Sequence, residues 1–289
     1  MSLLRPALSV LRTILDDPSN TGEKSFRLFA AAAWQIYKRS VPFPIVLPLD
    51  NGISFIADPA SGNSVGAIYT KIYESQYIVF ARKHMEKHGV LCDVGAHAGL
   101  CTLLLAPGFR QAVLFEPEPA TFLLLKRNLL INAMDYAIPI QAAASDHRGT
   151  GKLKVTGKYS GTTRLARSNE EGLDESSPSV ALVTVDETFA NLNVRSISFL
   201  KVDTEGHELQ VLKGCRRILT NSPGALVLYE NSQYDGVRDY FSELGWKVFG
   251  VDQHGQMRTN DTELRNAYNL FACGPNHQLY DSFPATPVA

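Results

Sequence analysis

The sequence predicts an α/β fold, in which a mostly parallel sheet carries helices on both faces. The first observation is the stretch 90–105, VLCDVGAHAGLCTLLL, which reads as a buried strand, a turn of small residues and an apolar helix. The second is that two further apolar stretches, 112–115 and 138–145, are each followed by an acidic residue. Because parallel strands end at one edge of a sheet, these acids are expected to line the crevice where open α/β folds bind ligands.

An N-terminal cap of helices and a hairpin is expected over residues 1–68, ahead of a larger domain over residues 69–289. Apolar residues recur at helical spacing in Ser2–Leu15, and Ser25–Lys38 also reads as a helix. The turn sequence Asp50-Asn51-Gly52, between two apolar runs, predicts the hairpin.

The first helix carries an apolar stripe that needs a partner. The stripe favours packing against the domain or against a second copy of the chain, so a homodimer through this helix is one of two expected arrangements. Contact with a membrane surface is less favoured, because only Arg5 and Arg12 accompany the stripe. The sequence does not decide between the domain and the second copy.

The larger domain is expected to begin with a helix or a helix pair over Tyr69–His88, which leads into the first buried strand. After the third strand, Gly151–Thr156 and Val180–Val185 read as strands on either side of a polar loop. The remaining elements are a strand at Ile197–Val202, a helix at Glu208–Leu219, a strand at Ala225–Tyr229, a helix at Asp235–Leu244 and an antiparallel pair of closing strands, Trp246–Val251 and Asn269–Cys273.

Composition restricts the classes of partner. The chain has 289 residues, 45% of them hydrophobic, which suits one large α/β domain with additions. A net charge of −1 argues against nucleic acid as the main partner. The four cysteines lack C-x-x-C spacing and are expected to be core residues in a reducing compartment. No apolar run approaches the ~18 residues of a membrane span, and no signal peptide is recognised, so a cytoplasmic location is expected.

The turn after the first strand does not match two common nucleotide-binding patterns. A dinucleotide fold calls for G-x-G-x-x-G, whereas Gly95 and Gly99 are separated by Ala96, His97 and Ala98. A P-loop calls for Gly-Lys-Ser/Thr, which does not follow here. About twenty residues after the turn, Glu116 stands where a carboxylate can accept hydrogen bonds from both hydroxyl groups of a ribose. The pattern therefore favours a nucleoside ligand.

Four short motifs, in this order and at this spacing, resemble the FkbM-type methyltransferases that use S-adenosylmethionine (SAM). They are DVGAHAG (93–99), FEPEP (115–119), SD (145–146) and KVDTEGHE (201–208). The resemblance covers residues 69–272 and implies a Rossmann-like, seven-stranded class I methyltransferase sheet. One departure is visible, since the family more often has Asn where this chain has His97.

The resemblance implies a set of cofactor-binding residues. Asp93 and the turn backbone would hold the methionine portion of SAM, Thr102 would bond its carboxylate, and Glu116 would hold its ribose. Ser145 and Asp146 would meet the adenine, and Glu74 is a candidate because a Tyr-Glu pair stands at this place in similar proteins. The full set is Glu74, Asp93, Gly95, Ala96, His97, Gly99, Thr102, Glu116, Pro117, Ser145 and Asp146.

The catalytic candidates follow the fourth strand. Asp203, Glu205 and His207 form a cluster from which an acceptor hydroxyl could lose its proton to a histidine or to a carboxylate of raised pKa. The sequence does not say which of them is the base. Capping of the following helix is the alternative role for Glu205 and Glu208, because carboxylates favour a helix N-terminus.

Two further sites are expected. Asp203 with Glu230 and Asn231 resembles the magnesium ligands of metal-dependent O-methyltransferases of this fold, and three oxygen ligands with water suit Mg²⁺. The polar loop 157–179 is long enough for a lid or a binding loop, so Tyr159 and Arg164 are substrate candidates, and a plain surface loop is the alternative.

The expected function is transfer of a methyl group from SAM to a hydroxyl of a sugar or a secondary metabolite, which leaves S-adenosylhomocysteine (SAH). The acceptor is a small or sugar-containing molecule. The alternatives are methylation of a nitrogen atom, a catalytically silent binding protein of this fold, and an NAD-dependent oxidoreductase, which the absent G-x-G-x-x-G disfavours.

Overall fold

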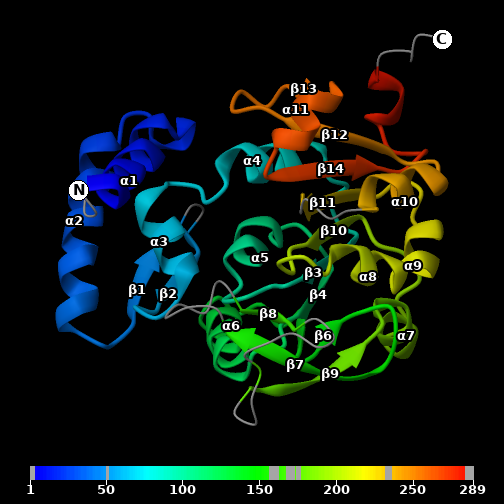
Figure 1. Cartoon of the computed structure of the whole chain (residues 1–289), viewed down its shortest axis with the longest axis horizontal. Helices are drawn as coiled ribbons and strands as arrows, with labels where there is room; N and C mark the ends of the chain where they lie inside the picture. Colours follow the sequence, from blue (N-terminus) through cyan, green and yellow to red (C-terminus); the bar gives the residue numbers. More distant parts are fainter. Residues whose placement is uncertain are drawn as a thin grey trace.

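A mostly parallel sheet is the centre of the computed structural model, which describes residues 4–49, 52–155, 163–166, 173, 177–231 and 236–283. Within these residues its strand order is β13-β12-β14-β11-β10-β3-β4-β5 (Figure 1). The strands from β5 to β11 run parallel, and β14 is antiparallel to both of its neighbours. The bounds are β3 Val90–Val94, β4 Gln111–Phe115, β5 Ala137–Ile140, β10 Phe199–Val202, β11 Leu226–Glu230, β12 Lys247–Val251, β13 Met257–Arg258 and β14 Asn269–Cys273.

The sheet confirms the predicted fold class and adds one strand to the predicted seven. The additional strand is the two-residue β13, which pairs with β12 and forms one edge of the described sheet. The expected closing pair is confirmed, since β12 and β14 lie side by side and antiparallel.

Helices cover both faces of the sheet because successive strand residues point to opposite sides. In β3, Leu91 packs into one core and Cys92 into the other. The first core includes α4 (Ser75–His84), α5 (Leu100–Leu105) and α6 (Pro119–Ile131). The second includes α7 (Val185–Asn191), α8 (Glu208–Lys213), α9 (Arg216–Thr220), α10 (Val237–Glu243) and α11 (Asp261–Asn266).

The predicted helix Glu208–Leu219 is two short helices, α8 and α9, separated at Gly214 and Cys215. A Cβ atom at Gly214 would lie 2.0 Å from the carbonyl oxygen of Ser145. Glycine is therefore required where this bend passes the segment that carries Ser145.

The predicted third strand, Ile138–Ser145, is wrong as a single element. Its first part is β5, an edge strand of the main sheet. Proline has no backbone N–H to donate, and Pro139 is tolerated there because an edge strand has no neighbour on its outer side. The chain then bends, with the Ala142 N–H donating to the Ile140 carbonyl, and enters a second sheet. That sheet has the order β6-β9-β7-β8, with β6 Ala143–Ala144, β7 Gly149–Val155, β8 Thr163–Leu165 and β9 Ser179–Val183. Ser145 and Asp146 therefore follow a strand of the second sheet.

The N-terminal helices and the hairpin lie at one end of the molecule, on the left of Figure 1. They are α1 (Leu4–Asp16), the 3-10 turn Pro18–Asn20, α2 (Lys24–Ser40), β1 (Ile45–Pro48), β2 (Ser54–Ala57) and α3 (Gly62–Tyr69). The predicted helices and hairpin are confirmed, and the turn residues Asp50 and Asn51 lie outside the described residues. The expected helix over Tyr69–His88 begins only at Ser75, and α3 precedes it.

Three asparagines join this end of the molecule to the rest. Asn128 of α6 accepts a hydrogen bond from the Ile56 N–H of β2 and donates one to the Ala98 carbonyl, in the turn after β3. Asn132 makes a matching pair with the backbone of Ser54. The buried Asn20 bonds the backbone around Tyr69, just ahead of Glu74. These bonds fix the segments that bring Glu74 and the turn together.

The structure also bears on the predictions about the cysteines and about membrane-spanning helices. All four cysteines are buried and unpaired, as predicted. Among the residues that the structure describes, no helix combines the length and the apolar character required to cross a bilayer.

Candidate active site

A cavity of about 230 Å³ opens at the carboxyl ends of β3, β4 and β10. Residues from six parts of the chain surround it: α3 with the segment before α4, the end of β3 with the turn and α5 that follow, the end of β4, the second sheet with the residue before it, the end of β10 with the segment after it, and Tyr268 just before β14. Ten of the predicted site residues line it, namely Glu74, Gly95, Ala96, His97, Glu116, Pro117, Arg164, Asp203, Glu205 and His207. The segment 142–144, which precedes Ser145, also lines it.

The turn after β3 is built from left-handed backbone. Gly95 has φ 77°, His97 has φ 49° and Gly99 has φ 85°. A Cβ at Gly95 would lie 1.8 Å from the Asp203 carbonyl oxygen, so glycine lets β3 and β10 end side by side. At residue 97, Asn, Asp and His are the side chains that tolerate a positive φ best, which accounts for His97 where the resembling family more often has Asn.

Glu116 is held at the tip of β4 with its carboxylate in the cavity. One carboxylate oxygen accepts from the His97 N–H at 2.9 Å, and the other accepts from the Glu118 N–H at 2.8 Å. Burial raises the pKa of Glu116 to about 7, although both hydrogen bonds act to lower it. Each oxygen retains a second lone pair, so the carboxylate can accept two more hydrogen bonds.

Asp93 and Thr102 lie beneath the cavity and do not line it. The Thr102 hydroxyl donates to Asp93 Oδ2 at 2.5 Å, and both residues are buried. The other oxygen, Asp93 Oδ1, is buried and has no hydrogen-bond partner in the part of the chain that the structure describes. Burial raises the pKa of Asp93, and the charge of Lys201 on the neighbouring strand acts in the opposite direction. Gly99, Ser145 and Asp146 also lie outside the cavity lining.

Lys201 is a buried cation that lines the cavity. It is 4% exposed, and its Nζ atom donates to Asp203 Oδ2 at 2.8 Å. Burial acts to lower the pKa of Lys201, but the charges of Asp203, Asp93 and Glu74 outweigh burial and raise it. Strand pairing sets this arrangement, since Lys201 of β10 stands opposite Asp93 of β3.

Three carboxylates gather next to this lysine. Asp203, Glu205 and Glu230 each place an oxygen within 4.8 Å of the other two. Burial, followed by repulsion from Asp203, raises the pKa of Glu205, and the same two causes raise the pKa of Glu230 to about 8. Glu205 adopts a left-handed backbone with φ 58°, which directs it back over the strand ends.

His207 faces a different neighbour from the acids. Its Nε2 atom lies 3.0 Å from Ser145 Oγ, and Ser145 in turn donates to Asp146. Burial lowers the pKa of His207. The carboxylate of Asp146 lies 2.6 Å from His147 Nδ1, and this hydrogen bond lowers the pKa of Asp146. The structure therefore joins His207 to the predicted adenine-side pair. Glu208, the alternative capping residue, accepts from the N–H groups of Thr204 and Gly206.

Glu74 enters the cavity from the start of α4. It has a left-handed backbone with φ 48°, and its Oε2 atom is buried without a hydrogen-bond partner. Burial raises its pKa, while Lys201 acts to lower it. The neighbouring Tyr73 also lines the cavity, and burial raises the pKa of its hydroxyl.

The second sheet and α3 form the side of the cavity opposite the strand tips. Thr163, Arg164 and Leu165 of β8 line it, together with Gly62 and Asn63 of α3. Arg164 is close enough to Glu205 for its charge to lower the pKa of that carboxyl, against the stronger effect of burial. The other predicted substrate residue, Tyr159, lies outside the described residues.

The predicted magnesium ligands do not all face the cavity. Asn231 does not line the cavity, and its amide nitrogen donates to the carbonyls of Leu264 and Ala267. Asp203 already pairs with the Lys201 ammonium. The arrangement of Asp203, Glu230 and Asn231 therefore does not fit the predicted set of magnesium ligands.

Among the residues that line this cavity, Lys201 and Tyr268 were not predicted as site residues, whereas Tyr73 belongs to the Tyr-Glu pair noted in the sequence. Lys201 stands inside the KVDTEGHE motif but reads as part of an apolar strand. Tyr73 and Tyr268 line the cavity from the segment before α4 and from the residue before β14. A charged residue within an otherwise buried strand was the available signal for Lys201, since an unpaired buried charge is costly.

Comparison with known proteins gives a match over more than half of the chain. The family model described as Methyltransferase FkbM domain matches residues 93–259. Methyltransferase sdnD from Sordaria araneosa is 27% identical over 176 residues, which are 51% of this chain and 67% of that protein. Hexuronic acid methyltransferase AglP from Haloferax volcanii is 29% identical over 147 residues, which are 50% of this chain and 58% of that protein.

A solved structure of a methyltransferase FkbM from Methylobacillus flagellatus KT also resembles the chain. It is 12% identical, with a TM-score of 0.44, and the match covers 86% of this chain and 60% of that one. The matched regions thus span about three fifths of the archaeal relative and of this solved chain.

Proposed function

The chain belongs to the FkbM methyltransferase family, and on this premise we propose that it transfers a methyl group from SAM to a hydroxyl group of a sugar or a secondary metabolite. The observation that carries the proposal is Glu116, a buried carboxylate at the tip of β4 that shares one cavity with the tips of β3 and β10. Binding of SAM and SAH is typical of this family. We also propose the division into a cap over 1–68 and a SAM-binding domain over 69–289.

The charges around the cavity suit a cationic cofactor. When bound, SAM supplies a methyl group on a positively charged sulfur atom and also carries an ammonium group. Glu74, Asp203 and Glu205 line the cavity, and the buried Lys201 offsets only part of their charge. Glu74 Oε2 has no hydrogen-bond partner among the described residues, so it can accept a hydrogen bond from the cofactor's ammonium group.

Glu116 and the turn after β3 provide the nucleoside side of the site. The two free lone pairs of the Glu116 carboxylate suit the two ribose hydroxyls. Ala96, His97 and Pro117 stand around it. Asp93 acts indirectly in this proposal, because it bonds Thr102 beneath the turn and supports the backbone above it.

Among the three catalytic candidates, Glu205 suits the role of general base best. Asp203 already accepts a hydrogen bond from the Lys201 ammonium group, and His207 lies within hydrogen-bond distance of the Ser145 hydroxyl. Glu205 lines the cavity, and burial raises its pKa, which makes it a stronger base than an ordinary carboxylate. In this proposal Glu205 accepts the acceptor's hydroxyl proton as the oxygen attacks the methyl carbon in line with the departing sulfur.

The wall of the cavity that β8 and α3 form suits an acidic sugar as the acceptor. The polar side chains that β8 and α3 bring to the cavity include the guanidinium of Arg164, the hydroxyl of Thr163 and the amide of Asn63. Arginine pairs with carboxylates in a planar, bidentate geometry. One matched relative is a hexuronic acid methyltransferase, whose acceptor carries such a carboxylate.

The proposal is tested with SAM and two matched acceptors, a glucuronide and the corresponding glucoside, with O-methyl products identified by NMR. We expect methylation of the glucuronide, and Arg164→Met should reduce its kcat/KM while leaving the affinity for SAM unchanged. Glu205→Gln should lower kcat by about 10²–10⁴-fold, and Glu243→Gln, at an exposed site on α10, is the matched control.

Three outcomes would contradict the proposal. Methylation of an amine but not of any hydroxyl would favour the N-methyltransferase alternative. Binding of SAM without turnover on any acceptor would favour a silent binding protein. A much larger loss in His207→Gln than in Glu205→Gln would assign the base to His207.

A further inference from the structure

Tyr268 is an exposed aromatic side chain at the rim of the cavity. It is 61% exposed, and among the exposed large apolar side chains of the described residues it is the one that lines the cavity. It stands just before β14, at the edge of the sheet where the parallel strands end, because β14 runs antiparallel to β11. An exposed aromatic ring beside a cavity is a surface on which an apolar face of a ligand can pack.

The backbone that carries Tyr268 is held in place by Asn231, which follows β11. The Asn231 N–H donates to the Tyr268 carbonyl at 2.8 Å. The Asn231 amide nitrogen donates to the carbonyls of Leu264 and Ala267 at 2.9 Å and 2.8 Å. Three hydrogen bonds from one residue therefore fix the connection between α11 and β14 that presents the tyrosine. A ring presented by fixed backbone loses less conformational entropy when a ligand packs on it.

The hydroxyl end of Tyr268 faces the carboxylates of the site. Burial, followed by the charges of Glu230, Asp203 and Glu205, raises the pKa of the Tyr268 hydroxyl. The phenol therefore keeps its proton at neutral pH and can donate a hydrogen bond. The same proximity places the ring beside Glu205, the proposed general base.

Tyr268 and Glu116 lie at opposite ends of the strand edge that the cavity follows. In the sheet order, β11, β10 and β3 stand between β14 and β4. A cofactor whose ribose bonds Glu116, at the tip of β4, is therefore anchored three strands away from Tyr268. The ring is available to the acceptor, which is the second molecule that the site must hold.

The chemistry of a sugar suits this surface. One face of a pyranose ring carries mainly C–H groups, which pack against an aromatic face, while its hydroxyl groups point outward to polar partners. The carboxylate of Glu205 and the hydroxyl of Tyr268, both from residues that line the cavity, provide such partners. A flat apolar metabolite would also pack on the ring, but it would leave these polar groups without hydrogen-bond partners.

We propose that Tyr268 binds the acceptor, that a sugar ring packs on its exposed face beside Glu205, and that Asn231 positions it. The inference rests on the proposed function and adds a residue that recognises the sugar ring itself, whereas Arg164 is proposed to recognise a carboxylate on that ring. Asn231, predicted from the sequence as a metal ligand, has a positioning role instead.

The test measures the binding of two matched sugars, methyl glucuronide and methyl glucoside, to the SAH complex of the full chain by saturation-transfer NMR. Tyr268→Ala should raise the Kd of both sugars about tenfold, because it removes the ring on which both pack. Arg164→Met should raise the Kd of the glucuronide alone. Tyr268→Phe keeps the ring, so its Kd values should stay within about threefold of the wild type.

Asn231→Ala tests the positioning role. It should raise the Kd of both sugars roughly threefold to tenfold, with an unchanged affinity for SAH. In the Tyr268→Ala background the same substitution should have no further effect on the sugars, because Asn231 acts through Tyr268. Two additive losses would contradict the positioning role.

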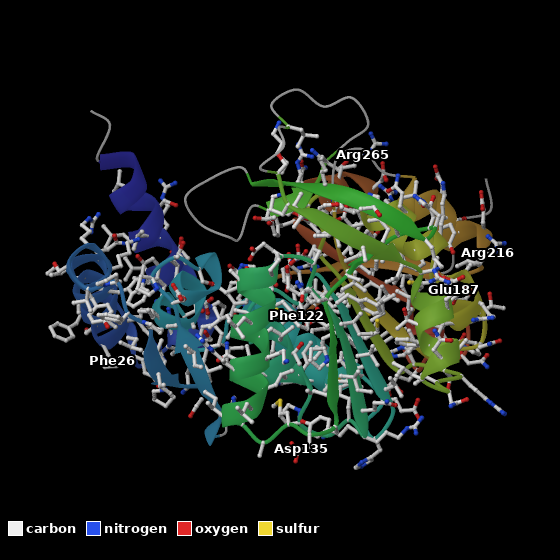
Figure 2. All side chains as sticks on the ribbon, turned by 90° about the horizontal axis from the view of Figure 1, so that it is seen from below. Phe26, Phe122, Asp135, Glu187, Arg216 and Arg265 are labelled. Atoms are coloured by element: carbon white, nitrogen blue, oxygen red, sulfur yellow. The ribbon has the colours of Figure 1, made fainter. Side chains whose placement is uncertain are left out.

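Phe26→Ala is the matched control. Phe26 is also 61% exposed, but it belongs to α2 and lies outside the cavity lining. Figure 2 shows it at the outer side of the N-terminal end of the molecule, pointing away from the rest of the chain. Removal of this ring should change neither sugar binding nor SAH binding. Thermal unfolding of each variant separates a loss of binding from a loss of the fold.

Sugar binding that is unchanged in Tyr268→Ala would overturn this inference, and methylation of a sugar hydroxyl by the wild type would then leave the proposed function in place. A loss of SAH affinity in Tyr268→Ala would also overturn it, since the residue would then contact the cofactor. A wild type that binds SAH but neither sugar would overturn the proposed acceptor class, and this inference with it.

Discussion

The ammonium group of Lys201 lies 2.8 Å from Asp203 Oδ2, two residues along the same chain, where β10 ends in the cavity. Lys201 is buried and is surrounded by the charges of Asp203, Asp93 and Glu74. A single buried cation thus balances carboxylates from three separate segments. This relationship leads to the first prediction.

Lys201→Met should destabilise the fold by about 3–5 kcal/mol, because it leaves buried carboxylates without their counter-charge. Without Lys201, the folded-state pKa values of Asp93 and Glu74 should rise further above their ordinary values. The free energy of unfolding of the variant should then fall as the pH rises, since the unfolded chain releases those protons more readily. Urea unfolding at several pH values measures this, and Lys213→Met, at an exposed position of α8, is the control.

Glu116 should make the affinity for SAM depend on pH. Burial raises its pKa from the ordinary value of 4.5 to about 7, and the ionised form is the better acceptor for ribose hydroxyls. We expect the Kd for SAM, measured by calorimetry, to increase as the pH falls through about 7. Glu116→Gln should weaken binding roughly 10–100-fold and abolish this pH dependence.

Ionisation of Glu116 strengthens SAM binding in this account, but it should lower the free energy of unfolding. Because the folded-state pKa of Glu116 is raised, its contribution to stability is lost as the pH rises from 4.5 to about 7. Glu116→Gln should therefore unfold with a weaker pH dependence than the wild type over this range. An unchanged pH dependence of both binding and unfolding would contradict the assignment of Glu116.

Gly95→Ala should lower the free energy of unfolding for two separable reasons. The residue has φ 77°, and a Cβ would also lie 1.8 Å from the Asp203 carbonyl oxygen. Gly255 has nearly the same φ, 75°, with open space around it. We expect Gly255→Ala to cost about 1 kcal/mol and Gly95→Ala about 2–4 kcal/mol in urea unfolding. Equal losses would show that β3 and β10 do not meet as closely as described.

Removal of metal should leave the enzyme active. Asp203 is paired with Lys201, and the Asn231 amide is bonded to Leu264 and Ala267, so the predicted ligand set is incomplete. Turnover after exhaustive dialysis against EDTA should stay within about twofold of the untreated value. If activity were lost and Mg²⁺ restored it, the gathered carboxylates of Asp203, Glu205 and Glu230 would be the first candidates for its ligands.

The fold was predictable from the sequence where local pattern decides the structure. The run 90–105 has strand, turn and helix signals within sixteen residues, and the structure confirms them as β3, the turn and α5. Pairing over long distances was not predictable. Residues 138–145 are mostly apolar and read as one strand, but β5 pairs with β4 while β6 pairs with β9, about forty residues later.

The site divides in the same way. The positions of Glu116, Asp203 and Glu205 follow from strand ends, which the sequence marks with acidic residues. The partners of His207 and Lys201 depend on segments 62 and about 108 residues away, which bring Ser145 and Asp93 beside them. These contacts are the reason for preferring Glu205 to His207 as the general base. They could not be predicted from the spacing of residues along the chain.

A crystal structure of the chain with SAH bound tests the central claim most directly. The account predicts that both ribose hydroxyls lie within about 3 Å of the Glu116 carboxylate, with the cofactor sulfur facing Glu205. SAH bound away from the tips of β3, β4 and β10, or a Glu116 carboxylate that does not contact the ribose, would contradict it.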